Sequence, residues 1–374
     1  MKKYIKDLFD GFIHGTLKKK IITILLILMA IFVLVVSIVP VQVSSTSPGS
    51  INQIASVITF ENGEDVELPK RSYTVSVYAK TKASILEYWI SKLDKNTDVK
   101  IDKREDEIYT INEENKIDVI AKDQSIQDSL ILAYDTAKNN GYDVNLNYTY
   151  KGIRVACVPV NALKTGPESL QIGDIVTEIN GEAIDDITEF KSIVSTIYEN
   201  HKANTASKTA NVKVLRDSKE LELSTCDIRT LSILGQYTSL YENNVPEYIF
   251  YEYFDLDLAS AKPKFSINKA YSSGPSGGLM QTLYVYDCIT KGSIINTKYV
   301  LATGTISRNG NVGEIGGIKQ KIMTAHYYQC EYFFVPSANY DDALSQYNTL
   351  KDPSYKLVKV DTIEDAINAL KGGN

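Results

Sequence analysis

One serine of this chain stands in a setting that suits nucleophilic chemistry. Ser276 lies in the run 274–278, Gly-Pro-Ser-Gly-Gly, directly before the apolar segment 279–286, which we expect to form a helix. The first N–H groups of a helix have no partner within it, and the helix dipole is positive there. An oxyanion forming beside Ser276 could therefore be stabilised by nearby backbone N–H groups. Taken alone, the serine could be only a helix cap, so the assignment depends on a base.

Lysine is a better candidate than histidine for that base. A serine hydroxyl is a weak nucleophile until a base removes its proton. Lys319 follows a Gly-Gly turn and opens the apolar-periodic segment Ile318, Ile322, Ala325, so we expect it in the first turn of a helix. The positive helix end and burial both lower a lysine pKa toward a value useful for a base. Lys321 is expected on the far side of this helix as a solvated charge. The chain has only three histidines, His14, His201 and His326.

Together these motifs resemble the serine-lysine proteolytic domain of the Lon protease family. The resemblance rests on Gly-Pro-Ser-Gly-Gly-Leu, on Thr-Gly-Thr-Ile at 303–306, on residues 313–319 and on the spacing from Ser276 to Lys319. It implies a Ser276–Lys319 catalytic dyad and a supporting hydrogen bond from Thr303 to the lysine. A sheet threonine paired with backbone is the alternative for Thr303. Two departures stand beside the nucleophile: Ser273 where many Lon proteins have an acidic residue, and Gly278 where alanine is usual.

A membrane anchor is expected near the N-terminus. Residues 1–20 form a basic arm that ends in Lys18-Lys19-Lys20, and 21–41 form an apolar run long enough to cross a bilayer. Lysines on the N-terminal side keep that side cytoplasmic, which leaves the remainder of the chain outside the cell. A cleaved signal peptide is the alternative, although its apolar region would be unusually long and 41–45 offers no good cleavage site.

The part of the chain between the anchor and the serine motif suggests two modules. Residues 51–143 form an α+β region that could pack on the last domain. Residues 144–228 look like a PDZ domain, because Gly-Asp-x-Val-x-x-Ile-Asn-Gly at 173–181 precedes an apolar helical stripe over 187–197. By that resemblance, loop N–H groups near Gly152 and Ile153 would capture a peptide carboxylate. The Lon-type domain is expected at 231–371, where strands and helices alternate.

Composition narrows the function further. The net charge of −6 and the lack of an aromatic-plus-basic cluster argue against nucleic-acid binding. No CxxC pair occurs, so no metal site and no cofactor are expected, and the cysteines could be buried thiols or disulfides. No Gly-x-x-x-x-Gly-Lys-Ser/Thr motif occurs either. The four cysteines are Cys157, Cys226, Cys288 and Cys330.

These features favour an α+β multidomain protein with an N-terminal transmembrane helix, a PDZ-like β-rich module and a Lon-type α/β proteolytic domain. The order resembles the membrane-anchored, ATP-independent PDZ-Lon proteases of Gram-positive bacteria. It implies an extracellular serine endopeptidase that cleaves secreted or unfolded peptides, signalling peptides included, presented by the PDZ domain. The alternatives are an inactive PDZ scaffold and a peptide-binding membrane protein.

Overall fold

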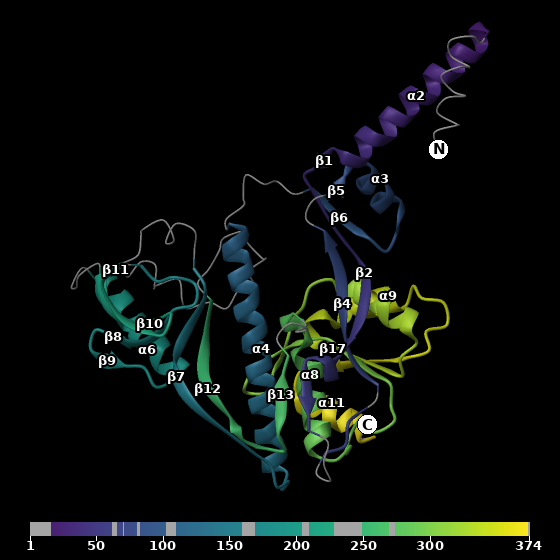
Figure 1. Cartoon of the computed structure of the whole chain (residues 1–374). Helices are drawn as coiled ribbons and strands as arrows, with labels where there is room; N and C mark the ends of the chain where they lie inside the picture. The colour runs from purple at the N-terminus through teal and green to yellow at the C-terminus, as the bar shows by residue number, and fades with distance from the viewer. Residues whose placement is uncertain are drawn as a thin grey trace. The chain divides into compact units, whose positions relative to one another are not determined.

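The computed structural model (Figure 1) describes residues 16–61, 66–69, 71–80, 83–101, 110–158, 169–203, 209–227, 249–268 and 274–372. The chain forms two compact units, Met1–Gly49 with Val77–Glu105, and Ser50–Ser76 with Asp106–Asn374. Strands β2 (Val43–Gln53) and β4 (Ser72–Lys80) each begin in one unit and end in the other. Most of the expected basic arm, 1–15, and the expected start of the last domain at 231 lie outside the described residues.

The first unit is built on the apolar helix α2 (Leu17–Ile38), which is long and apolar enough to cross a membrane. It begins before the apolar run expected at 21–41 because the three lysines continue the helix, and it ends before Pro40, which disfavours helical geometry in the preceding residue. Strand β1 (Pro40–Val41) pairs with β5 (Ala83–Ser84), which leads into α3 (Ile85–Leu93). The first residues of β2 pair with β6 (Asp98–Ile101).

The second unit contains a largely parallel sheet that carries the serine motif. Its strands follow the order β18 (Lys356–Val360), β17 (Tyr332–Pro336), β14 (Val300–Ala302), β4 and β2. The pairs β18/β17, β17/β14 and β14/β4 are parallel. Strand β14 is wholly buried, as its apolar sequence requires in a sheet covered on both faces. The associated helices are α8 (Gly278–Ile289), α9 (Ile318–Tyr328), α10 (Tyr340–Tyr347) and α11 (Ile363–Leu370).

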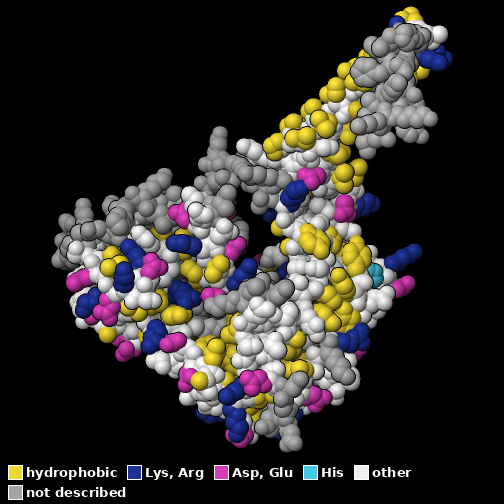
Figure 2. Space-filling model, in the orientation of Figure 1, with side chains coloured by type: hydrophobic (Ala, Val, Ile, Leu, Met, Phe, Trp, Pro, Cys, Tyr) yellow, Lys and Arg dark blue, Asp and Glu magenta, His cyan; other side chains and the backbone are white. Residues whose placement is uncertain are grey.

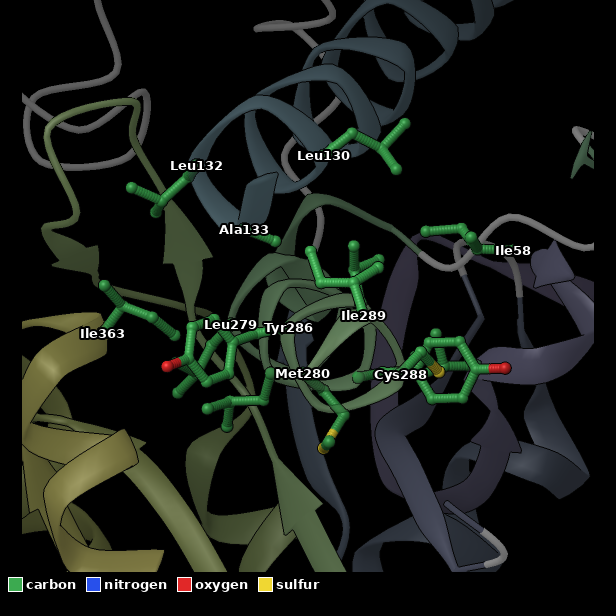
Figure 3. Close-up of a cluster of buried hydrophobic side chains, with 14 of the residues drawn as sticks. Ile58, Leu130, Leu132, Ala133, Leu279, Met280, Tyr286, Cys288, Ile289 and Ile363 are labelled. Atoms are coloured by element: carbon green, nitrogen blue, oxygen red, sulfur yellow. The ribbon is translucent and has the colours of Figure 1, made fainter. Parts of the chain in front are cut away.

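Residues far upstream of the serine motif complete this core. Strand β4 lies beside β14, with Ser72 opposite Val300, and helix α4 (Ile111–Asn139) packs against α8. Figure 3 shows side chains from α4 meeting side chains of the buried helix α8. The region 51–143 therefore supplies a central strand and a packing helix to the same core as the serine motif. The close-up labels Leu130, Leu132 and Ala133 on α4, Leu279, Met280, Tyr286, Cys288 and Ile289 on α8, and Ile58 and Ile363.

A second sheet holds most of the module expected at 144–228. Its strands follow the order β11 (Lys219–Asp227), β10 (Thr209–Arg216), β8 (Ile175–Ile179), β7 (Asn145–Cys157) and β12 (Ile249–Lys262). Strand β9 (Glu182–Ala183) follows a turn at Asn180-Gly181, in which both residues have positive φ. Helix α6 (Ile187–Lys202) buries Phe190 and Val194 in the core of this sheet.

The structure does not place a carboxylate-binding loop at Gly152 and Ile153. Both residues lie inside β7, where Gly152 pairs with Tyr253 of β12, and Ile153 pairs with β12 on one side and β8 on the other. Gly152 has φ +133°, and a Cβ atom there would lie 2.4 Å from the carbonyl oxygen of Val176. Glycine is therefore required by the close approach of β8, and the prediction of a peptide-binding loop at these residues is wrong.

The cysteines are all buried, two in each sheet region of the second unit. Cys157 and Cys226 lie in β7 and β11, whereas Cys288 and Cys330 are buried thiols near the parallel sheet. Among the described residues, no group of three or more His, Cys, Asp or Glu side chains could hold a metal ion.

Candidate active site

Ser276 occupies a single turn of 3₁₀ helix, Pro275–Gly277, that runs directly into α8. Gly274 precedes this turn in an extended conformation, and Pro275, with its fixed φ, stands at the first helical position. The amide of Gly277 donates to the carbonyl of Gly274 at 3.0 Å, and that of Gly278 donates to Pro275. The serine side chain is half-buried, at the end of a helix that is otherwise fully buried.

A lysine side chain reaches the serine from α9. The Nζ atom of Lys321 lies 3.0 Å from the Oγ atom of Ser276. Helix α9 begins after Gly317, whose left-handed backbone (φ 69°) turns the chain into the helix. Lys321 is in the first turn and only 3% exposed, so its ammonium form would be almost completely removed from water. The distance is within the range for a base that removes the hydroxyl proton.

Thr303 fixes the orientation of this amine. Its Oγ1 atom lies 2.9 Å from Nζ of Lys321 and donates to the carbonyl oxygen of Ser276 at 3.2 Å. Because the threonine proton is used on that carbonyl, Oγ1 accepts a hydrogen from the lysine. A neutral lysine then has its lone pair left for the proton of Ser276. Thr303 follows β14, and its own amide donates to Phe334 of β17, so the parallel sheet positions this hydroxyl.

Burial lowers the pKa of Lys321 from 10.5 to about 7. Desolvation penalises the charged ammonium, and among the described residues no carboxylate forms an ion pair with it to offset this penalty. The positive end of α9 acts in the same direction. Lys321 is thus a buried amine that is substantially neutral at physiological pH, in contact with a half-buried serine hydroxyl.

The lysine that contacts the serine is Lys321, and not the Lys319 expected from the sequence. Lys319 is exposed on the surface of α9, and Lys321, expected to be an ordinary solvated charge, is the buried one. Two residues of a helix differ by about 200° in direction, so the two lysines cannot both face the serine. The sequence carries a signal for this burial: Lys321 joins Ile318, Ile322 and Ala325 in the i, i+3, i+4, i+7 stripe of the buried helix face, whereas Lys319 does not.

The amide groups around the serine differ in their availability for an oxyanion. Those of Gly277 and Gly278 donate within the 3₁₀ turn, and that of Leu279 donates to the carbonyl of Gly304 at 3.1 Å. Among the described residues, the amide of Ser276 has no acceptor. The N–H group of Ser276 is therefore, among the described residues of this turn, the candidate donor to an oxyanion.

Two serines of α4 that the sequence did not point to contact the turn that carries Ser276. Ser125 Oγ donates to the carbonyl of Pro275 at 3.3 Å, and Ser129 Oγ lies 3.1 Å from the carbonyl of Gly278. A Cβ atom at Gly278 would lie 2.9 Å from Ser125 Oγ and 2.8 Å from Cγ2 of Ile306. Glycine at 278 therefore matches a close approach of α4 and β15 (Thr305–Ile306) to the turn.

The strand β14, the turn at Pro275–Gly277 and the helices α8 and α9 bring this serine and lysine together in an α/β domain. Residues 252–371 match the family described as the Lon protease (S16) C-terminal proteolytic domain.

Two curated relatives are Lon proteases. The peroxisomal Lon protease homolog 2 of Kluyveromyces lactis is 26% identical over 139 residues, which are 37% of this chain and 13% of that protein. The Lon protease of Campylobacter concisus is 28% identical over 160 residues, 42% of this chain and 18% of that protein. The chain thus matches less than a fifth of the length of either relative.

Replacing Thr303 by valine is expected to lower kcat/KM for peptide hydrolysis by about 100-fold. Valine has nearly the same shape but cannot hold the lysine amine or donate to the carbonyl of Ser276. Thr303→Ser is the matched control, because it retains the hydroxyl and should keep most of the activity. Steady-state rates on one peptide compare the variants, and equal rates for Thr303→Val and wild type would remove the orienting role.

Proposed function

We propose that this chain is a membrane-anchored serine endopeptidase in which Ser276 is the nucleophile and Lys321 is the general base. The observation that carries the proposal is the 3.0 Å contact between Lys321 Nζ and Ser276 Oγ at a lysine whose pKa is lowered to about 7. The Lon-type proteolytic domain over 252–371 supports the same class of chemistry.

The proposed mechanism has two stages. In acylation, neutral Lys321 takes the proton of Ser276 as its oxygen attacks the peptide carbonyl, and the resulting oxyanion is stabilised by the amide of Ser276. The lysine then gives the proton to the departing amine. In deacylation the same lysine takes a proton from water, which attacks the acyl-enzyme, and it then gives that proton to the departing Ser276 oxygen, so the second product is released and the free serine is restored. Thr303 keeps the lysine lone pair directed at the reacting hydroxyl throughout.

The proposal extends to where and on what the enzyme acts. The first turn of α2 carries Lys18, Lys19 and Lys20 and the rest of the helix is apolar, which favours a single span with a cytoplasmic N-terminus and an extracellular catalytic domain. Cleavage would be ATP-independent, and the 374 residues contain no P-loop motif. Substrates would then be peptides or chain segments that are already extended, signalling peptides among them.

A PDZ-like role for the second sheet is also part of the proposal. The Asn180-Gly181 turn and the packing of α6 on strands β7, β8 and β10 support it. The module would present extended peptides to the active site. Its capture loop is not at Gly152 and Ile153, which are paired within the sheet.

Peptide hydrolysis as a function of pH tests this function. We expect full-length protein in lipid nanodiscs to cleave an unstructured fluorogenic peptide without nucleotide, with kcat/KM rising with pH around a midpoint near 7. The sign follows from the mechanism, because only the neutral lysine accepts the serine proton. A stably folded protein without an unstructured tail should remain uncut. Binding of the peptide without cleavage at any pH would instead favour a scaffold.

The pH experiment needs one control variant. Burial also raises the pKa of Asp128 on α4 to about 7. The Oδ1 atom of this aspartate accepts a hydrogen bond from Gln124 at 3.0 Å. Asp128→Asn should leave the midpoint of the rate profile near its wild-type position. If that variant abolished the pH dependence, the midpoint would belong to Asp128 and not to Lys321.

A further inference from the structure

Helix α3 in the first unit exposes an apolar stripe. Leu86, Trp89, Ile90 and Leu93 recur at the i, i+3, i+4, i+7 spacing of one helix face, and no residue of α3 is buried. Trp89 is 46%, Ile90 58% and Leu93 84% exposed. Single exposed apolar residues are ordinary, but a continuous stripe on one helix indicates a surface that something apolar covers.

The helix is well formed in spite of this exposure. Ser84 caps its N-terminus: the amide of Glu87 donates to Ser84 Oγ, and the Glu87 carboxylate accepts from the amide of Ser84 at 2.8 Å. Glu87 also pairs with Lys80. The polar residues thus occupy the sides of α3 away from its stripe, which makes the helix amphipathic.

The stripe adjoins the apolar helix α2. The rings of Trp89 and Phe32 stack with their centroids 6.5 Å apart, and the amide of Ile85 donates to the carbonyl of Val39 just after the end of α2. The pairing of Pro40 with Ser84 holds the two helices together at this point. Figure 2 shows apolar side chains along the length of α2, so α3 borders a surface that itself requires an apolar surrounding.

The contact of Trp89 with Phe32 of α2 indicates how deep in the bilayer the Trp89 ring would lie. Phe32 precedes the last residue of α2, Ile38, by six residues, which at 1.5 Å per residue is about 9 Å along the helix axis. Amphipathic helices that lie on membranes bury their apolar face about 5–10 Å into the boundary between headgroups and acyl chains. Tryptophan is the residue type most characteristic of that layer.

We propose that α3 is an interfacial membrane helix whose stripe of Leu86, Trp89, Ile90 and Leu93 lies in the lipid of the leaflet where α2 ends. This rests on the proposed membrane anchoring by α2. The anchor then has two parts, a spanning helix and a helix lying in the interface, and the second restrains rotation of the first unit about the axis of α2. The hydrogen bond from Ile85 to Val39 and the pairing of Pro40 with Ser84 hold α3 beside the end of α2, so that both helices can contact the lipid at the same time.

The chain contains a single tryptophan, so its intrinsic emission reports on α3 alone. Full-length protein is reconstituted into phosphatidylcholine vesicles, and Trp89 emission is measured with lipids brominated at shallow or deep acyl positions and with aqueous iodide. We expect blue-shifted emission, a strong loss of intensity with shallow bromine, a smaller loss with deep bromine, and little effect of iodide. Alkaline carbonate extraction of the same vesicles reports separately whether α2 is integrated.

Two matched variants sharpen the test. Ile90→Asp with Leu93→Asp places charge on the stripe and should shift Trp89 emission to the red and open it to iodide. Ser91→Asp places the same kind of charge on the opposite side of α3 and should leave the emission unchanged. Peptide hydrolysis should be unaffected in all three proteins, because α3 does not contribute to the nucleophile turn.

The outcomes separate the two claims. If Trp89 is open to iodide while the chain resists carbonate, the interfacial helix is wrong and the α2 anchor stands. If carbonate releases the chain, both are wrong. If Trp89 is shielded from iodide and from brominated lipid alike, and dilution of protein in the vesicles exposes it, the stripe is covered by a second copy of the chain, which also overturns the proposal.

Discussion

Lys321→Met is expected to lower kcat/KM for peptide hydrolysis by about 10³-fold or more. Methionine fills nearly the same buried volume but has no group that can accept the proton of Ser276 or contact Thr303. The matched control is Lys319→Met on the exposed side of the same helix, which should retain wild-type activity. Loss of activity in the Lys319 variant alone would return the base to the position chosen from the sequence.

Lys321 should also make the free energy of unfolding depend on pH. In the unfolded chain Lys321 titrates near 10.5 and in the folded protein near 7, so between these values the unfolded state binds more protons and stability rises with pH. Lys321→Met removes this dependence. The difference in melting temperature between Lys321→Met and wild type should therefore be more in favour of the variant at about pH 6 than at about pH 9. A variant that unfolds more easily at both values would show that the buried amine is structural.

Ser276→Ala is expected to reduce hydrolysis at least about 10³-fold while peptide binding is retained, because only the attacking oxygen is lost. The turn should keep its shape, since Pro275, Gly277 and Gly278 form its backbone hydrogen bonds. Rates and peptide affinity measured on the same preparation separate the two effects. Simultaneous loss of affinity would indicate that the turn had collapsed.

The double variant Ser276→Ala with Lys321→Met gives the sharper result. Two groups that act as one unit lose their effect together, so the double variant should be no slower than either single one. Losses that multiply would mean that the serine and the lysine act in separate steps, and the dyad would have to be abandoned.

The turn that carries Ser276 could be predicted from the sequence because its evidence is local. Glycines and a proline beside Ser276 specify a turn before a helix, and the structure has that turn at Pro275–Gly277. The lysine was harder, because the choice between Lys319 and Lys321 depends on helix phase. A shift of two residues reverses the face, and the Gly-Gly turn alone does not set that phase. The buried stripe of α9 does.

Contacts from distant segments could not be predicted in the same way. Ser125 and Ser129 lie about 150 residues before the nucleophile turn that they support, and no local pattern distinguishes them from other serines of a helix. The strand beside β14 likewise comes from Ser72–Lys80, on the other side of the β-rich module. Such pairings are set by global packing.

The error at Gly152 has a different origin. A glycine before an apolar strand suggested a loop. In the structure β12, which begins at Ile249, pairs with β7 on both sides of Gly152, so the residues before and after this glycine belong to one strand. Glycine is needed at this position because a Cβ atom would clash with the carbonyl oxygen of Val176 on the neighbouring strand. A glycine can thus stand in a sequence either because a loop needs it or because a neighbouring strand comes close, and only the position of the neighbouring strand distinguishes the two.

If Lys321 is the neutral base of Ser276, its own titration must show it. Nuclear magnetic resonance of protein with isotope-labelled lysine side chains, recorded across pH, should show one lysine with a midpoint near 7. That signal should be absent from Lys321→Met and present in Lys319→Met. A Lys321 signal that titrates near the ordinary value of 10.5 would rule Lys321 out as the base, because such a lysine could not accept the serine proton at neutral pH.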